Sequence, residues 1–323
     1  MRVLVSGGSG FVGQHLVGAL LAQGHRVAML GRDWSRAAAT IAAGASPISA
    51  DLRDRAAIIA ACAGQDAVFH VGALSAPWGR AADFHAINVG GTENVLAGCE
   101  RHGVGRLVAV SSPSVLFDGR DQHLLSDAAP YPRRFVSTYS LTKKLAEDRV
   151  RAAQARGLAT VILRPKAIFG PGDTTLLPRL VEAARRGRLP QIGAGRNQVD
   201  LTYVGNVVHA LLLALEAPAA VGNTYTITND EHPLLWEVIG GVLDRLGIDS
   251  RLRRVPLGLA MAAAGLMELR AAATGREPLL TRYSVAILAR SQTYDISAAR
   301  RDLGYAPPVS LAEGIEITLG AMQ

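Results

Sequence analysis

Tyr139 and Lys143 stand four residues apart in the segment TYSLTKK, which has the composition of a helix. Side chains with this spacing lie on the same helix face. A phenol, whose pKa is about 10, is a poor acid or base at neutral pH, but a nearby ammonium lowers that pKa by stabilising the phenolate. Such a tyrosine can pass a proton to or from a carbonyl or hydroxyl oxygen while hydride moves at the adjacent carbon. The pair therefore predicts a catalytic centre for carbonyl and alcohol interconversion.

Serine hydroxyls follow the apolar run RLVAVSS, in the order Ser111, Ser112, Pro113, Ser114. If this run is a parallel strand, the serines lie at the carboxyl edge of the sheet, where ligands bind in such folds. We expect Ser112 to hydrogen-bond the substrate oxygen and to orient it toward Tyr139, with Ser114 as the second candidate.

A glycine-rich loop separates the first apolar run, RVLVSG, from the first helical segment. Glycines at these positions permit a tight turn, a close approach to a pyrophosphate, and close packing of helix on strand. The helix N-terminus offers free N–H groups to the phosphates. The loop predicts a dinucleotide site with the contact residues Gly7, Ser9, Gly10, Phe11, Val12 and Gly13.

The end of the second apolar run indicates which dinucleotide binds. A carboxylate there would accept the ribose hydroxyls of NAD, but the chain reads Gly31-Arg32-Asp33. Gly31 leaves room for a 2′-phosphate, and Arg32 can pair with it. NADP(H) is therefore favoured over NAD(H), although a register shift toward Asp33 would reverse this preference. Asp51 and Leu52, after the third run, are placed to meet the adenine.

The elements that must position these residues alternate through the first half of the chain. Six short apolar runs have the length and β-branched content of buried parallel strands: RVLVSG, HRVAMLG, SPISAD, DAVFHVGA, RLVAVSS and ATVILRP. The segments between them are amphipathic, at 12–23, 35–43, 54–63, 84–102 and 138–156. This alternation predicts an α/β fold, a doubly wound parallel sheet covered by helices on both faces. After Pro165 we expect a helix after GPGDTTLLPRL, a strand at 199–203, a helix at 204–216, a strand at 225–228 and then a mainly helical region.

Composition excludes several classes of protein. The 323 residues are 49% hydrophobic and 19% charged, which excludes a disordered or fibrous chain. The net charge is +7, but only three of the 34 basic residues are lysines, and the arginines are spread along the whole chain. A nucleic-acid-binding surface would need a patch or stripe, so we expect no nucleic-acid partner.

The cysteines, the histidines, the N-terminus and the longest apolar run together predict a cytoplasmic protein without a metal site. The two cysteines lie in helical segments, and the eight histidines form no metal-binding pattern. The N-terminus MRVLVSGG has no signal-peptide character. The longest apolar run, Val255–Met267, is too short to span a bilayer, so we expect no transmembrane segment.

Together these motifs resemble the extended short-chain dehydrogenase/reductase superfamily, and the segments LRPKAIFGPGD and VDLTYVGNVVHA resemble it too. The resemblance implies a Rossmann-like NAD(P)-binding domain of residues 1–170 with 198–228, and a substrate-binding cap of 171–197 with 229–323. It implies a catalytic set of Ser112, Tyr139 and Lys143 with an accessory Asn88, Lys143 also holding the nicotinamide ribose. Further cofactor contacts are expected at Ala73, Pro165 and Ile168.

Finer details resemble the 3β-hydroxysteroid dehydrogenase-like branch, and within it the bacterial 2-alkyl-3-oxoalkanoate reductases. They are the segments APWG at 76–79, SPSV at 112–115, REPLLTRY at 276–283 and ARRDLGY at 299–305. Gly205 departs from the superfamily, which usually has an acidic residue there, and this weakens any role for Asn206.

The resemblance implies an NADP(H)-dependent reductase of a ketone on an apolar substrate, a 2-alkyl-3-oxoalkanoate, in a homodimer. We expect the run Val255–Met267 to roof the substrate cleft and a C-terminal arginine to meet the substrate carboxylate. The alternatives are a 3β-hydroxysteroid dehydrogenase and a nucleotide-sugar epimerase that uses NAD. Dehydration is disfavoured because Pro113 and Ser114 replace the Asp–Glu pair of dehydratases, and a non-catalytic dinucleotide sensor is disfavoured because Tyr139 and Lys143 are both present.

Overall fold

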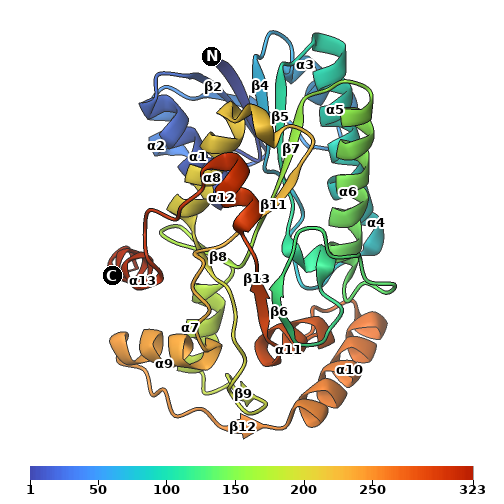
Figure 1. Cartoon of the computed structure of the whole chain (residues 1–323). Helices are drawn as coiled ribbons and strands as arrows, with labels where there is room; N and C mark the ends of the chain where they lie inside the picture. Colours follow the sequence, from blue (N-terminus) through green and yellow to red (C-terminus); the bar gives the residue numbers. More distant parts are fainter. Residues whose placement is uncertain (323) are drawn as a thin grey trace.

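The computed structural model describes residues 1–322, and its centre is a seven-stranded parallel sheet (Figure 1). The strand order is β11-β7-β5-β4-β1-β2-β3. The order changes direction between β1 and β4, and in such sheets a ligand crevice opens at this point. The strands are β1 (Arg2–Ser6), β2 (Arg26–Gly31), β3 (Ser46–Ser49), β4 (Ala67–His70), β5 (Arg106–Val110), β7 (Thr160–Pro165) and β11 (Thr224–Ile227).

Helices cover both faces of this sheet, as the alternation predicts. Val3 and Val5 of β1 belong to a core formed with α1 (Phe11–Ala22), α8 (Val204–Glu216) and α12 (Ser297–Leu303). Leu4, between them, points to the other face. The core there is formed with α3 (Arg55–Ala61), α5 (Gly91–His102) and α6 (Thr138–Ala155). The fold is therefore Rossmann-like.

The rest of the chain forms a smaller region beside the carboxyl ends of the strands (Figure 1). Three parallel strand pairs occur here, β8 (Ile168–Phe169) with β10 (Thr202–Tyr203), β9 (Gln191–Ile192) with β12 (Arg254–Val255), and β6 (Gln122–Leu125) with β13 (Gln292–Tyr294). The helices are α7 (Leu177–Arg185), α9 (Leu235–Arg245), α10 (Leu257–Thr274), α11 (Arg282–Ala289) and α13 (Leu311–Gly320). They share a separate core that includes Val181, Trp236, Ile239 and Val285.

The strand expected at 199–203 is only the two-residue β10, and two helices also differ from the expectation. The helix expected at 84–102 begins earlier, as α4 (Ala81–Phe84), and passes through a π-helical turn at His85–Gly90 before α5. π-Helical turns are rare and are found frequently at functional sites. The helix expected at 35–43 is only the short α2 (Ala38–Ala42).

Candidate active site

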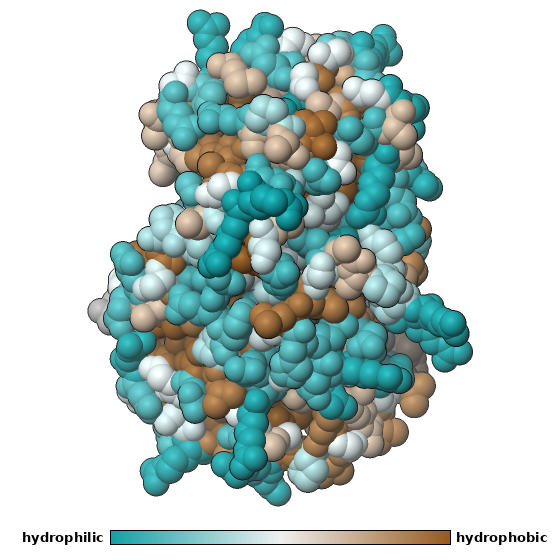
Figure 2. All heavy atoms as spheres, in the orientation of Figure 1, coloured by the Kyte–Doolittle hydropathy of each residue, from teal (hydrophilic) through white to brown (hydrophobic). Residues whose placement is uncertain are grey.

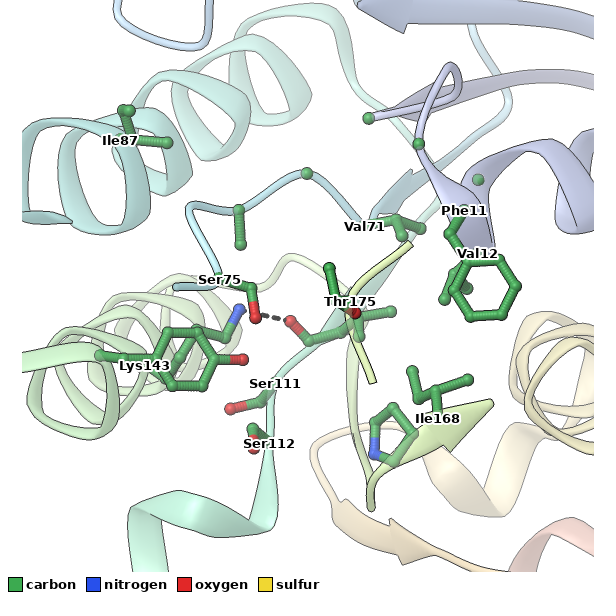
Figure 3. Close-up of a pocket in the computed structure, with 18 of the residues that line it drawn as sticks. Phe11, Val12, Val71, Ser75, Ile87, Ser111, Ser112, Lys143, Ile168 and Thr175 are labelled. Atoms are coloured by element: carbon green, nitrogen blue, oxygen red, sulfur yellow. Dashed lines mark hydrogen bonds between the residues drawn. The ribbon is translucent and has the colours of Figure 1, made fainter. Parts of the chain in front are cut away.

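A cleft of about 600 Å³ runs along the carboxyl edge of the sheet. It brings together all but one of the residues that the sequence predicts for the site. They are Gly7, Ser9, Gly10, Phe11, Val12, Gly13, Arg32, Asp51, Leu52, Ala73, Ser112, Tyr139, Lys143, Pro165 and Ile168. Figure 3 shows Phe11 and Val12 at one end, Ile168 across the cleft, and Ser112 and Lys143 at the other end.

The loop between β1 and α1 is shaped by its glycines. Gly7 has φ +73°, which favours glycine, and its carbonyl oxygen occupies the space where a Cβ of Gly13 would lie. The loop thus packs tightly against the start of α1, whose first residues line the cleft and whose first N–H groups have no partner within the helix. This glycine cradle fits the pyrophosphate of a dinucleotide.

The end of β2 lies at the adenosine side of the cleft. A Cβ at Gly31 would collide with the Ser9 hydroxyl. The glycine therefore lets the end of β2 pack closely against the glycine-rich loop, and it also leaves room for a ligand. The Arg32 side chain is 67% exposed, and its Nη1 lies 3.4 Å from Asp51 Oδ2. Hydrogen bonds from Arg53 hold the pKa of Asp51 well below its usual range. Asp33 is not among the lining residues and instead accepts a hydrogen bond from the Ser35 amide.

Tyr139 lies in the first turn of α6, which Ser137 caps by accepting a hydrogen bond from the Ser140 amide at 3.1 Å. Burial raises the pKa of the Tyr139 phenol, although the hydroxyls of Ser75 and Ser112 oppose the shift. The expectation of a lowered pKa is therefore wrong for this structure, because burial has the larger effect. The phenol is protonated at neutral pH.

Lys143 lies one turn further along α6 and points into the same part of the cleft (Figure 3). Its Nζ donates a hydrogen bond to the Val110 carbonyl oxygen at 2.6 Å. Burial lowers the pKa of Lys143 to about 8, against the opposing charge of Glu147. The ammonium thus has one fixed partner and keeps two donors for a ligand.

Three serine hydroxyls follow β5, as the sequence predicts. Ser112 Oγ accepts a hydrogen bond from the Ser114 amide at 3.2 Å and caps the short 3₁₀ helix Pro113–Leu116. The hydroxyls of Ser111 and Ser114 are buried without a hydrogen-bond partner among the described residues. Ser112 lines the cleft beside Tyr139, so it can donate to a bound oxygen while its lone pair accepts from the backbone.

Asn88 is the one predicted site residue that does not line the cleft. It is buried, and its side chain bonds the amide and the carbonyl of Leu74, at 2.7 and 3.1 Å, and Thr142 Oγ1 at 3.1 Å. The structure therefore places this accessory residue outside the lining of the cleft, in contact with the backbone of Leu74 and with α6. The π-helical turn directs Asn88 toward the backbone beside Ser75 and toward α6, and it is a positioning residue.

Four polar residues of the cleft carry no predicted role, Thr175 and the three described next. Ser75 follows Leu74 in the loop after β4, Lys166 follows β7, and Tyr283 comes from α11. Lys166 Nζ donates to Gln292 Oε1 at 2.6 Å, and burial lowers the pKa of Lys166 to about 8. The segments PKAIFG and TRYSV contain Lys166 and Tyr283, but composition alone did not single these residues out.

Two expectations about the C-terminal region are wrong. No residue of the run Val255–Met267 lines the described cleft, because α10 packs one face on the core of the smaller region and leaves Leu259, Leu266 and Leu269 exposed. No C-terminal arginine lines that cleft either, and Lys166 is the cation between Pro165 and Ile168.

The departure at Gly205 has a steric reason. A Cβ at this position would lie 2.7 Å from the ring of Tyr203, so the tyrosine occupies the space of an acidic side chain. Asn206 is fully buried and donates to Asn229 Oδ1 and the Val309 carbonyl, which is a structural role.

Comparisons with known proteins agree with this geometry. The family model described as the 3-beta hydroxysteroid dehydrogenase/isomerase family matches residues 4–257. A 2-alkyl-3-oxoalkanoate reductase of Stenotrophomonas maltophilia is 41% identical over 98% of this chain and 97% of its own. A decarboxylating sterol-4-alpha-carboxylate 3-dehydrogenase of Mus musculus is 33% identical over 98% of this chain and 90% of its own.

Among solved structures, a double mutant of the Streptomyces venezuelae dTDP-glucose 4,6-dehydratase DesIV, with NAD and DAU bound, superposes with a TM-score of 0.79. It is 27% identical, and the match covers 99% of this chain and 96% of that one.

Proposed function

The chain belongs to the 3-beta hydroxysteroid dehydrogenase/isomerase family of NAD(P)-dependent oxidoreductases, and from this premise we propose that it reduces the 3-keto group of a 2-alkyl-3-oxoalkanoate with NADPH. The observation that carries the proposal is the position of Tyr139 beside Ser112, at the end of a cleft that begins with a glycine cradle suited to a dinucleotide. A protonated phenol is the form that a ketone reductase needs as its acid.

Each polar residue at this end of the cleft has a separate role in the proposed reaction. When bound, the dinucleotide supplies the hydride that adds to the carbonyl carbon of the substrate. Ser112 holds the carbonyl oxygen, and Tyr139 donates its phenolic proton to that oxygen as negative charge develops on it. Lys143 holds the nicotinamide ribose with its free donors, and its charge stabilises the phenolate that remains.

The substrate side of the cleft supports an apolar acid. Ile87, Leu176 and Ile287 line it with hydrocarbon, while Lys166 adds one buried cation. A 3-oxo acid with alkyl arms matches both features, since the chains contact hydrocarbon and the carboxylate pairs with the ammonium. The relative with 41% identity bears the name of this activity.

Arg32 supports the choice of NADPH, because it lines the cleft at the end of β2 and Asp33 does not. Its charge would meet a 2′-phosphate, at the cost of its long contact with Asp51.

A 3β-hydroxysteroid is the second candidate substrate, since the same apolar lining accepts a sterol and a sterol dehydrogenase is among the relatives. A parallel turnover assay on a 2-alkyl-3-oxoalkanoate, a 3β-hydroxysteroid and a UDP-hexose tests the proposal. We expect turnover of the first with NADPH. Activity on the UDP-hexose alone would overturn the assignment.

A further inference from the structure

Helix α10 (Leu257–Thr274) is apolar, yet the protein does not bury it. By length and composition it is the one described helix that could cross a membrane, with a mean hydropathy of 1.2 over its 18 residues, but only 17% of them are buried. A helix that is hydrophobic all round is normally enclosed by a core or by lipid. The fully buried residues of α10 are Ala260, Ala264 and Ala271, and Leu257 and Met261 pack beside them with partial exposure.

The outward face of α10 carries a continuous apolar stripe. Its members follow one another at intervals of three or four residues, the spacing of one helix face. They are Leu259, Ala262, Leu266, Leu269 and Ala273, all exposed, with the three leucines 64%, 69% and 70% accessible. Figure 2 shows hydrophobic residues gathered at the lower right edge of the molecule, over the place of α10 in Figure 1.

Exposed arginines surround this stripe. Arg253 and Arg254 precede α10, Arg270 lies near its end, and Arg276 follows it. Within residues 1–322 none of these four has an acidic partner within salt-bridge distance, whereas the neighbouring Glu268 is already paired with Arg282 at 2.7 Å. An apolar stripe bordered by free cations is complementary to a bilayer surface that contains anionic lipid.

A second copy of the chain fits the stripe less well. A two-fold symmetric contact places the same patch on both sides of the interface. The free arginines around one α10 would then approach those around the other, and like charges at close range oppose association. An anionic lipid surface can contact the leucines with its hydrocarbon and the arginines with its charged headgroups.

The stripe lies close to the substrate end of the cleft. Helices α10 and α11 pack side by side (Figure 1), and Arg282 at the start of α11 joins them through Glu268. Tyr283 and Ile287 of α11 line the cleft. We propose that α10 lies in the plane of an anionic membrane surface, with the leucine stripe in the interface. If the proposed function holds, this position lets an alkyl substrate reach the cleft from lipid.

Vesicle co-sedimentation of the whole protein, without substrate, tests the membrane contact independently of the proposed function. Two vesicle types are compared, pure phosphatidylcholine and a mixture with about 30% phosphatidylglycerol. We expect the protein to bind the anionic vesicles at least about tenfold more tightly, because the arginines add electrostatic attraction to apolar burial.

The variants separate the two contributions. Leu266→Glu with Leu269→Glu should reduce binding to anionic vesicles by about tenfold or more. Arg253→Gln with Arg254→Gln should remove much of the preference for anionic lipid. Ile317→Glu, at a residue of α13 that is 41% exposed, is the matched control and should bind like the parent protein. Unchanged unfolding temperatures confirm that the variants fold.

Two results would overturn the proposal. One is a parent protein that does not sediment with anionic vesicles. The other is a parent dimer that Leu266→Glu with Leu269→Glu converts to monomer in light scattering, which would assign the stripe to a second copy.

Discussion

Asn88 donates a hydrogen bond from Nδ2 to Thr142 Oγ1 at 3.1 Å, and this bond joins the π-helical turn to the helix that carries Tyr139 and Lys143. The same amide holds both backbone groups of Leu74, next to Ser75 in the cleft. One side chain outside the cleft thus fixes two of its walls relative to each other.

Asn88→Ala should lower the free energy of unfolding by about 2–4 kcal/mol, because it leaves two partly buried backbone groups of Leu74 without this partner and removes the buried bond to Thr142. It should also lower kcat more than it weakens dinucleotide binding, since Tyr139 and Ser75 lose their common support. Denaturant unfolding and steady-state kinetics measure the two effects. Thr142→Val removes one of the three Asn88 bonds, together with the bonds from Thr142 to the Thr138 and Tyr139 carbonyls. It leaves the Leu74 groups paired and is the control with the smaller loss. A stable Asn88→Ala protein with normal kcat would show that the network positions nothing.

Tyr139→Phe removes the proton donor and keeps the ring. We expect kcat for ketone reduction to fall by about 100- to 10,000-fold. Dinucleotide affinity should persist, because the phosphate cradle and Lys143 are unchanged. Rapid-quench turnover and a fluorescence titration with the reduced dinucleotide check the two parts. Near-normal turnover would mean that another group supplies the proton.

The alternation of strands and helices, and the positions of the motifs within it, could be predicted from the sequence. Glycine loops and the Tyr139–Lys143 spacing are local patterns, and parallel strands bring their carboxyl ends to one edge whatever the tertiary detail. Fifteen predicted site residues therefore lie along one cleft.

The features that the sequence did not predict depend on packing between distant segments. Burial raises the pKa of Tyr139. The four-residue spacing of Tyr139 and Lys143 does not show how deeply the phenol is buried. Asn88 points away from the cleft because of a π-helical turn. The pattern of apolar and polar residues in this segment does not distinguish such a turn from an ordinary α-helix. The apolar run in α10 has the composition of a core helix, and only its place at the edge of the molecule shows that its leucines are exposed.

Arg32→Ala tests the preference for NADPH. Loss of one charged partner of a 2′-phosphate should raise the Kd of NADPH by about tenfold or more and leave that of NADH nearly unchanged. Titration of both reduced dinucleotides measures this. Asp33→Asn is the matched control at a residue outside the cleft. Tighter NADH binding in the parent protein, sensitive to Asp33→Asn and not to Arg32→Ala, would reverse the assignment.

The buried pair Glu147–Arg164 should govern acid stability. Burial opposes the charge of Glu147, but hydrogen bonds from Arg164 at 2.7 and 2.8 Å outweigh it and lower the pKa of Glu147 to about 2. A carboxyl with a lowered folded-state pKa contributes stability above its unfolded value, and this contribution, about 3 kcal/mol, is lost as the pH falls from about 4.5 to 2.

Glu147→Gln should therefore destabilise the protein at pH 7 by about 3–5 kcal/mol, because the buried Arg164 loses its close carboxylate and keeps only a carboxylate contact of 3.9 Å with Asp127. The free energy of unfolding of this variant should also depend less on pH in the acid range. Glu147→Leu with Arg164→Met removes both charges and should recover much of the loss. Unfolding at several pH values measures these effects, and an acid slope unchanged in Glu147→Gln would contradict them.

Lys166→Gln tests the proposed contact with the substrate carboxylate. The buried Lys166 ammonium donates to Gln292 Oε1 and lies over the ring of Tyr294, and Lys166 is the cation that lines the cleft between Pro165 and Ile168. Its loss should raise KM for a 2-alkyl-3-oxoalkanoate by about 10- to 100-fold, the range of a charge-assisted hydrogen bond. The methyl ester of the same compound has no carboxylate, so its KM should change little. If Lys166→Gln weakens acid and ester equally, Lys166 supports only the packing around Gln292, and the substrate carboxylate has another partner.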